Sequence, residues 1–365
     1  MEPETLVSRT KRMSGKRSPH CEYRRYARHK RAIVVALAVL VAGVATLSMT
    51  IGSADLSVVD VVLALFGRGD EYDRIVVWNL RMPRVLTALV GGVALAMAGC
   101  AFQSTLRNPL ASASTLGISQ GAAFGASVAI ILLGANGAAA YEGVQFSSNP
   151  YVTVVCAFLG AMASTLVVLG LSRLREMTPE SIVLAGVALS ALFAGGTTMI
   201  QYFAEDSQVA AVVFWTFGDL SRVSYRELAI MGCVTAVSAV FFFLNRWNYN
   251  AMESGEAAAH GLGVNVRSVR LAGMFVASAA AASIIAFCGI INFVGLVAPH
   301  VMRRFIGSDY RYLLPASAFA GAGLLLVSDI VAHAVVAPLI LPISAITSFV
   351  GAPMFLYLLF KGVSR

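Results

Sequence analysis

The sequence predicts an all-α polytopic membrane protein with about ten transmembrane helices. Of its 365 residues 58% are apolar and only 13% are charged, and the mean hydropathy is +0.77. A soluble domain has about a quarter charged residues, so this chain cannot cover a water-facing surface of ordinary composition. Apolar runs near the roughly 20-residue bilayer length recur throughout. A soluble enzyme, a secreted disulfide module and a disordered protein are therefore excluded for most of the chain.

The first 31 residues form a basic tail. They hold ten basic and three acidic side chains, which is +7 of the chain's net +8. The positive-inside rule places such a segment in the cytoplasm. Binding to anionic lipid headgroups is an additional interpretation, whereas nucleic-acid binding is disfavoured because the charge is confined to this tail. A secretory signal is disfavoured because no small-x-small cleavage site follows. We expect a cytoplasmic tail over 1–31 and one transmembrane permease domain over 32–361.

Apolar segments follow in order after the tail. They lie near 32–52, 82–106, 115–134, 150–172, 181–203, 227–245, 269–291, 293–307, 313–336 and 340–360. Basic residues such as Arg107, Arg173 and Arg246 fall in alternate connections. An even number of crossings puts these connections and both termini on the cytoplasmic side.

The stretch from Arg270 to Arg303 is too short for two full crossings. Its 33 steps cover about 50 Å as a helix, against roughly 30 Å for each crossing. One of the two elements must be short or broken, and Gly289, Gly295 and Pro299 supply the break. A similar interruption at 106–111 in the first half points towards a central transport route, because irregular backbone at membrane depth needs protein or a wet cavity around it. Two ordinary loops are the alternative.

Small residues recur at helix-contact spacing in the first half of the chain. Gly92, Ala96 and Cys100 form one such stripe, and Gly117, Gly121 and Gly125 form another. Both stripes indicate close helix packing and leave the function open.

The sequence lacks the usual signs of catalysis. It has no G-x-x-x-x-G-K-[ST] motif, and none of its four lysines lies in a phosphate-binding glycine loop. The five cysteines form no C-x-x-C pair, and neither cysteines nor histidines show ligand spacing. We therefore expect no enzyme activity, no cofactor and no metal site in this chain.

Asp329 is the clear acidic residue within an apolar segment, and His333 follows one helical turn later. Ion-driven carriers place such groups in the membrane, so the pair could relay protons in a secondary carrier. It could equally be a structural hydrogen-bonded pair. A membrane scaffold without transport activity is a third hypothesis.

The connection over 246–268 is the longest basic-flanked loop after the tail. The stretch from Glu253 to His260 predicts a short helix, ended by Gly261 and Gly263. A short helix on the inner face is suited to docking a soluble partner, and a solvated loop is the alternative.

An ordered series of motifs over about residues 55–361 resembles the FecCD-type permeases of ABC importers for iron chelates, haem and cobalamin. The motifs are Arg81–Arg84, Gly99–Gln103, Arg107–Ala111, Leu116–Ser119 with Gly121, Leu184–Ala188, Trp215–Leu220, Leu262–Val264, Phe293–His300, Leu313–Pro315, Ser328–Ile330 and Val350–Pro353. The resemblance implies a type II importer fold in a bacterial or archaeal cytoplasmic membrane. It also implies a second permease subunit, identical or a close paralogue, two ATP-binding cassette subunits inside, and a periplasmic or lipid-anchored binding protein outside.

The resemblance also assigns roles to particular residues. Arg81 and Arg84 would meet acidic residues of the binding protein, since guanidinium groups hold carboxylates well; anchoring at the interface near Trp78 is the alternative. The residues expected to couple to the ATPase are Glu253, Gly255, Glu256, His260, Leu262, Gly263 and Val264. The residues expected to form the cytoplasmic gate are Asn108, Leu110, Thr178 and Ser181.

Three further expectations concern the cargo and the departures from the family pattern. Met199, Tyr202 and Phe203 would either touch a bulky chelate or simply pack. Family habit favours a ferric siderophore, then haem, then cobalamin. His333 stands where relatives often have arginine, so a third docking contact is not carried over. Asn292 and 342–344 replace frequent glycine positions, so the family's local helix geometry is not carried over there.

Overall fold

All regular secondary structure is helical in the part that the computed structural model describes, residues 19–52, 56–135, 149–174, 178–336 and 339–363. The helices are α2 (Pro19–Thr50), α3 (Val58–Leu65), α4 (Glu71–Ile75), η1 (Val76–Arg81), α5 (Met82–Thr105), α6 (Ile118–Ser127), η2 (Val128–Leu132), α7 (Pro150–Leu174), α8 (Pro179–Tyr202), α9 (Asp206–Thr216), η3 (Leu220–Arg222), α10 (Tyr225–Leu244), α11 (Arg246–Glu253), α12 (Glu256–Gly261), α13 (Val266–Cys288), α14 (Val294–Ile306), α15 (Tyr310–Ala334) and α16 (Ile343–Val363). Each predicted apolar segment falls on one of them, except 115–134, which covers α6 and η2.

Seven of these helices are long and apolar enough to cross a membrane, and Ile118–Leu132 and Ile343–Tyr357 are shorter apolar helices. The predicted polytopic helical fold is therefore confirmed. The first helix begins at Pro19, earlier than expected, so the basic residues from Arg24 onward continue the same helix as the first span. The tail before Pro19 lies outside the described residues.

The predicted break between the two segments after Arg270 lies at residues 289–293. α13 ends at Cys288, and Gly289 and Phe293 both have positive φ, +78° and +63°. α14 has only 13 residues, so one element is short as predicted. Pro299 was wrongly expected to take part in the break, because it lies inside α14. Gly295 was wrongly included too, because it lies in α14 at a close approach to Leu95 O of α5.

α5 forms the centre of the bundle and is buried along most of its length. It packs against α15, α13, α14 and α10. Two glycines allow the closest approaches: an added Cβ at Gly92 would meet the backbone of Ala322 on α15, and one at Gly99 would meet the carbonyl of Gly295 on α14. Gly121 and Gly125 likewise seat α6 on α7.

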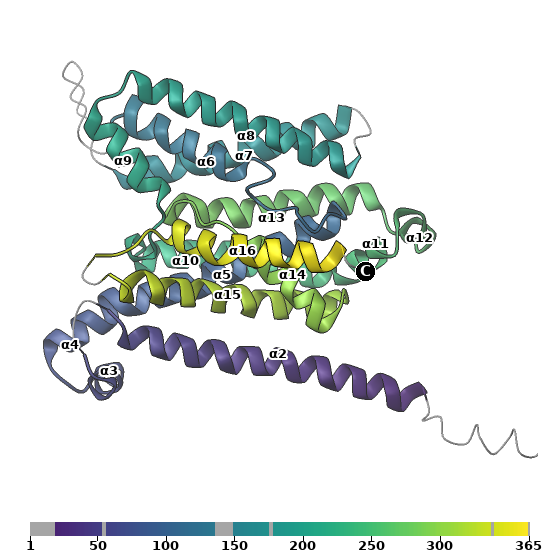
Figure 1. Cartoon of the computed structure of the whole chain (residues 1–365), viewed down its shortest axis with the longest axis horizontal. Coiled ribbons are helices and arrows are strands. Elements are labelled where there is room, and N and C mark those ends of the chain that lie inside the picture. Colours follow the sequence, from purple (N-terminus) through teal and green to yellow (C-terminus); the bar gives the residue numbers. More distant parts are fainter. Residues whose placement is uncertain (1–18, 53–55, 136–148, 175–177, 337–338, 364–365) are drawn as a thin grey trace, which may run out of the picture.

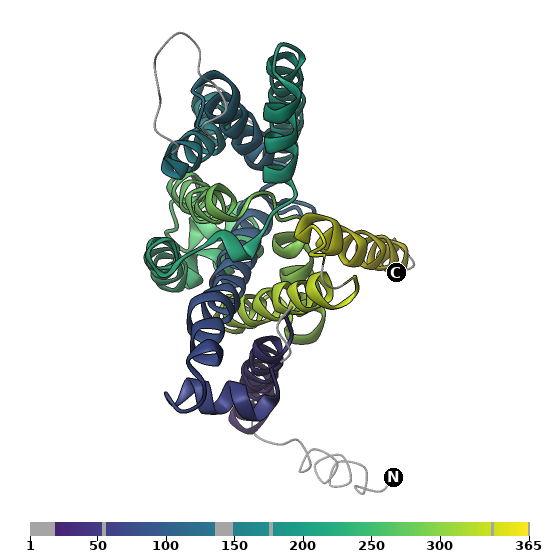
Figure 2. The same ribbon diagram turned by 90° about the vertical axis from the view of Figure 1, so that its left-hand side faces the viewer.

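The long helices lie side by side, and short elements mark the two ends of the bundle (Figure 1). α12 lies at one end, which we call the α12 end, and α3, α4 and α9 lie at the opposite end, the α9 end. α2 and α8 lie at opposite margins in both views (Figure 2), and both are mostly exposed along their spans.

Candidate transport and coupling sites

The α11–α12 segment projects at the α12 end of the bundle (Figure 1). The single short helix predicted over 253–260 is divided in two, because Gly255 has φ +113° and separates α11 from α12. Gly263, with φ +80°, ends the segment, as predicted from its glycines. Glu256 and His260 are exposed, and Leu262 leaves 71% of its surface exposed. An apolar side chain exposed on a solvated helical turn is suited to contact with a partner.

Polar contacts bind this segment to the bundle. Glu253 forms an ion pair with Arg303 of α14 at 3.3 Å, and Glu256 forms one with Arg270 of α13. Asn250 donates to Asp309 at 3.2 Å. Burial raises the pKa of Asp309, but hydrogen bonds from Arg311 and Asn250 outweigh burial and lower it overall. These contacts hold the α11–α12 segment to the bundle. The side that carries Glu256, His260 and Leu262 is exposed to solvent in this chain.

The predicted gate residues lie in two turns near the α12 end. Asn108 Oδ1 accepts a hydrogen bond from the N–H of Leu110 at 2.9 Å, which closes a tight turn after α5. Thr178 caps α8 by accepting from the N–H of Ser181 at 3.3 Å. Thr178 also lines a cleft of about 450 Å³ together with Glu256, His260 and Arg270. The structure thus brings one predicted gate residue beside two predicted coupling residues.

Arg81 and Arg84 are buried, with 3% and 5% of their surface exposed. Arg81 Nη1 donates to the carbonyl of Met49 at 2.7 Å. Arg84 Nη2 donates to the carbonyls of Ser48 and Ile51 at 3.1 and 2.9 Å. Both arginines therefore bind the end of α2, whose last carbonyls need donors.

Arg84 also forms an ion pair with Asp329, which the sequence reasoning missed. Arg84 Nε lies 3.2 Å from Asp329 Oδ2, and Asp329 is fully buried. His333 Nδ1 bonds the main-chain oxygen of Asp329 at 2.9 Å and lies 3.5 Å from its carboxylate. The sequence did hold one sign of this pair: charged residues within membrane segments usually pair with one another, so a basic partner for Asp329 could have been predicted.

The three predicted pathway residues are exposed at the α9 end of α8. Tyr202 and Phe203 leave 80% and 77% of their surfaces exposed and pack edge to face at 5.1 Å, and Met199 is exposed as well. These side chains are available to a second subunit, to lipid or to a passing ligand.

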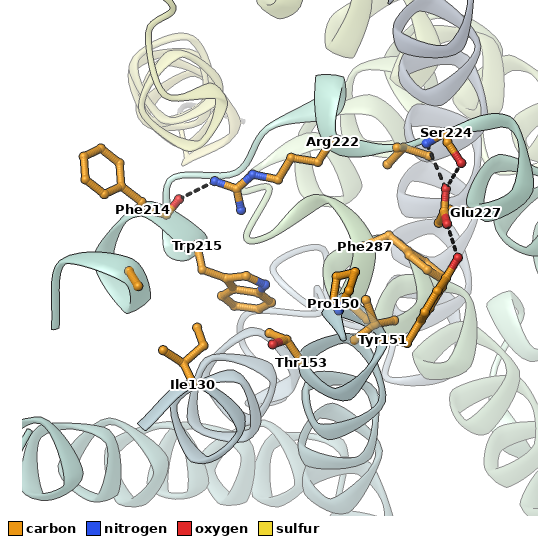
Figure 3. Close-up of a pocket in the computed structure, with 14 residues that line it drawn as sticks. Ile130, Pro150, Tyr151, Thr153, Phe214, Trp215, Arg222, Ser224, Glu227 and Phe287 are labelled. Carbon is orange, nitrogen blue, oxygen red and sulfur yellow. Dashed lines mark hydrogen bonds between the residues drawn. The ribbon is translucent and has the colours of Figure 1, made fainter. Parts of the chain in front are cut away.

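A cavity of about 540 Å³ lies among α7, α9, α10 and α13 (Figure 3). Aromatic side chains line it, and Arg222 donates to the carbonyl of Phe214 at 3.0 Å. Glu227 accepts hydrogen bonds from Tyr151 and from the N–H of Ser224. Sequence reasoning missed this cavity, because its walls come from distant segments.

Comparisons with known proteins agree with this architecture. Residues 37–361 match the FecCD transport family. The chain is 48% identical to the protein named "Putative ABC transporter permease protein MJ0087" of Methanocaldococcus jannaschii, over 94% of this chain and 98% of that one. It is 35% identical to the hemin transport system permease protein HmuU of Yersinia pestis, over 78% of this chain and 83% of that one.

A solved structure with the same arrangement is "An inward-facing conformation of a putative metal-chelate type ABC transporter". It superposes with a TM-score of 0.77 at 27% identity, and the match covers 91% of this chain and 99% of that one. The chain is thus a multi-pass membrane permease of the ABC importer class. It belongs to the FecCD transport family.

Proposed function

We propose that this chain moves an iron chelate inward across the cytoplasmic membrane, powered by ATP hydrolysis on a separate subunit. The observation that carries the proposal is the α11–α12 segment, which is bound to α13 and α14 by ion pairs while Leu262 stays exposed. A segment that is held to the bundle by ion pairs and exposes an apolar side chain to solvent is suited to bind an ATPase subunit. The chain itself would carry no ATPase site.

A ferric siderophore is the favoured cargo, followed by haem and cobalamin. The hemin permease of Yersinia pestis and the metal-chelate transporter structure support a metal chelate as the cargo class. Uptake of a panel of labelled chelates by the reconstituted complex tests this choice, and transport of none of them would contradict it.

The cargo would pass between this chain and a second permease subunit, identical or a close paralogue. α8 supports this arrangement, because its apolar face is exposed and carries Met199, Tyr202 and Phe203 at one end. Asn108, Leu110, Thr178 and Ser181 would close the route at the other end. Leu110 supplies an exposed apolar side chain for this closure.

The α12 end would face the cytoplasm, together with the basic tail over 1–31 and both termini. The positive-inside rule supports this orientation, since Arg107, Arg173, Arg267 and Arg303 all belong to connections or helix ends at this side. Two ATP-binding cassette subunits would then dock on residues 253–264. A binding protein would dock at the α9 end.

The binding protein would dock near Arg81 and Arg84. Gly52 lies against the guanidinium group of Arg81: a Cβ added at Gly52 would lie 3.3 Å from Arg81 Nη2. Direct contact of Arg81 with acidic residues of a partner would therefore require Gly52 to move away. The ion pair of Asp329 with Arg84 supports a structural role for this carboxylate over a role in proton transport.

A further inference from the structure

The last turn of α5 closes with a residue in an unusual conformation. The N–H of Asn108 donates to the carbonyl of Gln103 at 3.1 Å, and that of Arg107 donates to Ser104 at 3.2 Å. This bonding pattern requires a left-handed residue at its centre, usually glycine. Here the residue is Arg107, with φ +45°. A left-handed arginine costs conformational energy, so the turn is sensitive to whatever holds the helix end.

The carbonyl of Thr105 has no main-chain donor one turn ahead. Its regular partner would be the N–H of residue 109, but Pro109 has none. Arg270 of α13 supplies the missing donor, because its Nε lies 3.1 Å from Thr105 O. The same guanidinium group pairs through Nη2 with Glu256 of α12. One side chain therefore joins α12 to the end of α5.

We call the two contacts of Arg270, with Thr105 O and with Glu256, the Arg270 bridge. The helices around this bridge are closely packed. Gly273 lies one turn beyond Arg270, and an added Cβ there would come within 3.3 Å of Thr105 Cγ2. α13 is thus held directly against α5. The Arg270 side chain is largely buried, with 14% exposed, whereas Glu256 has 45% exposed. A displacement of the exposed Glu256 carboxylate would therefore displace the buried guanidinium group of Arg270, which donates to Thr105 O.

α11 also packs on α5 and α13, but its polar side chains bind other helices. Its Glu253 and Asn250 bind Arg303 and Asp309, on α14 and at the start of α15. α12 packs mainly on α11 and α13. The polar connection from α12 towards the turn over 107–110 therefore runs through Arg270.

We propose that Arg270 is a positioning residue that passes movement of α12 to the turn over Arg107–Leu110. This inference rests on the proposed function, in which α12 receives the ATPase. Movement of Glu256 draws the guanidinium group away from Thr105 O. The last turn of α5 then loses its donor, and the Asn108–Leu110 turn rearranges.

Hydrogen exchange tests the bridge without requiring transport. The full chain is placed in lipid nanodiscs, and exchange of the amides of 107, 108, 110 and 111 is followed. Arg270→Met should accelerate it about tenfold, because a charge-assisted hydrogen bond to the helix end is lost. Arg267→Met, an exposed neighbour on the same helix, and Glu256→Gln, which leaves the Thr105 contact in place, should match the unmodified chain. Unchanged exchange in Arg270→Met overturns the proposal.

The coupling step is tested in the complete complex with its ATPase and binding-protein subunits. Arg270→Met should keep ATP hydrolysis while uptake per ATP falls several-fold, and Arg270→Lys should recover part of the loss. A structural role alone would lower ATP hydrolysis and uptake together, and unchanged uptake per ATP in Arg270→Met contradicts the proposal. If the unmodified complex shows no ATP-dependent uptake, the proposed function fails, and the exchange experiment still decides whether the bridge exists.

Discussion

Arg84 Nε lies 3.2 Å from Asp329 Oδ2, and both side chains are buried between α5 and α15. Ser48 Oγ of α2 lies 3.4 Å from the same carboxylate oxygen, and Arg84 also binds two carbonyls at the end of α2. One ion pair thus joins three helices, of which α2 is otherwise mostly exposed. The pair explains why two charges persist within apolar segments.

Removing either partner of this pair should destabilise the fold. Arg84→Met or Asp329→Leu leaves one buried charge uncompensated, which costs about 3–5 kcal/mol. The double variant should regain most of that loss, because no unpaired charge is left. Thermal unfolding of the purified chain in detergent measures these effects. A double variant as unstable as the sum of the two single variants would show that the ion pair has no such role.

The contact between α5 and α14 should tolerate no added methyl group at Gly99. Gly99→Ala would place a Cβ against the carbonyl of Gly295, so the helices must separate. We expect a loss of more than about 2 kcal/mol, seen as a lower unfolding temperature and a poor yield of monodisperse protein. Gly232→Ala on α10 is the matched control, since nothing lies within 4 Å of its added Cβ. Equal behaviour of the two variants would refute this packing.

Leu262 should contribute to ATPase docking. Leu262→Asp places a charge on the exposed apolar side of the segment and should weaken co-purification of the ATPase subunit at least tenfold, while the chain's own unfolding temperature stays the same. Phe66→Asp is the control, because Phe66 is also exposed but follows α3 at the α9 end. Normal docking by Leu262→Asp would remove this residue from the interface.

The proposed orientation predicts which residues are reached from each side of the membrane. In a background without accessible native cysteines, His260→Cys should react with a membrane-impermeant maleimide only from the cytoplasmic side. Phe66→Cys should react only from outside, because Phe66 follows α3 and His260 lies in α12, and these two helices lie at opposite ends of the bundle. The reverse labelling pattern would invert the topology.

Much of the fold was predictable, because hydropathy and glycine placement act locally. The apolar runs predicted the helices, and Gly263 and Gly289 marked real interruptions, whereas the interruption at Gly255 was not predicted. The partnership of Arg84 with Asp329 was missed, since it joins helices far apart in sequence.

The bond from Arg270 to Thr105 was missed for a different reason. Its acceptor is a main-chain oxygen, which no residue type reveals. Pro109 was the one local sign that this carbonyl needs a donor.

Uptake by proteoliposomes tests the central claim most directly. This chain is reconstituted with its ATPase subunit, a second permease subunit and the binding protein, and entry of a labelled ferric siderophore is followed. We predict uptake that requires ATP, requires the ATPase subunit and disappears when residues 253–264 are altered. Uptake by this chain alone that is abolished by a protonophore would contradict the claim.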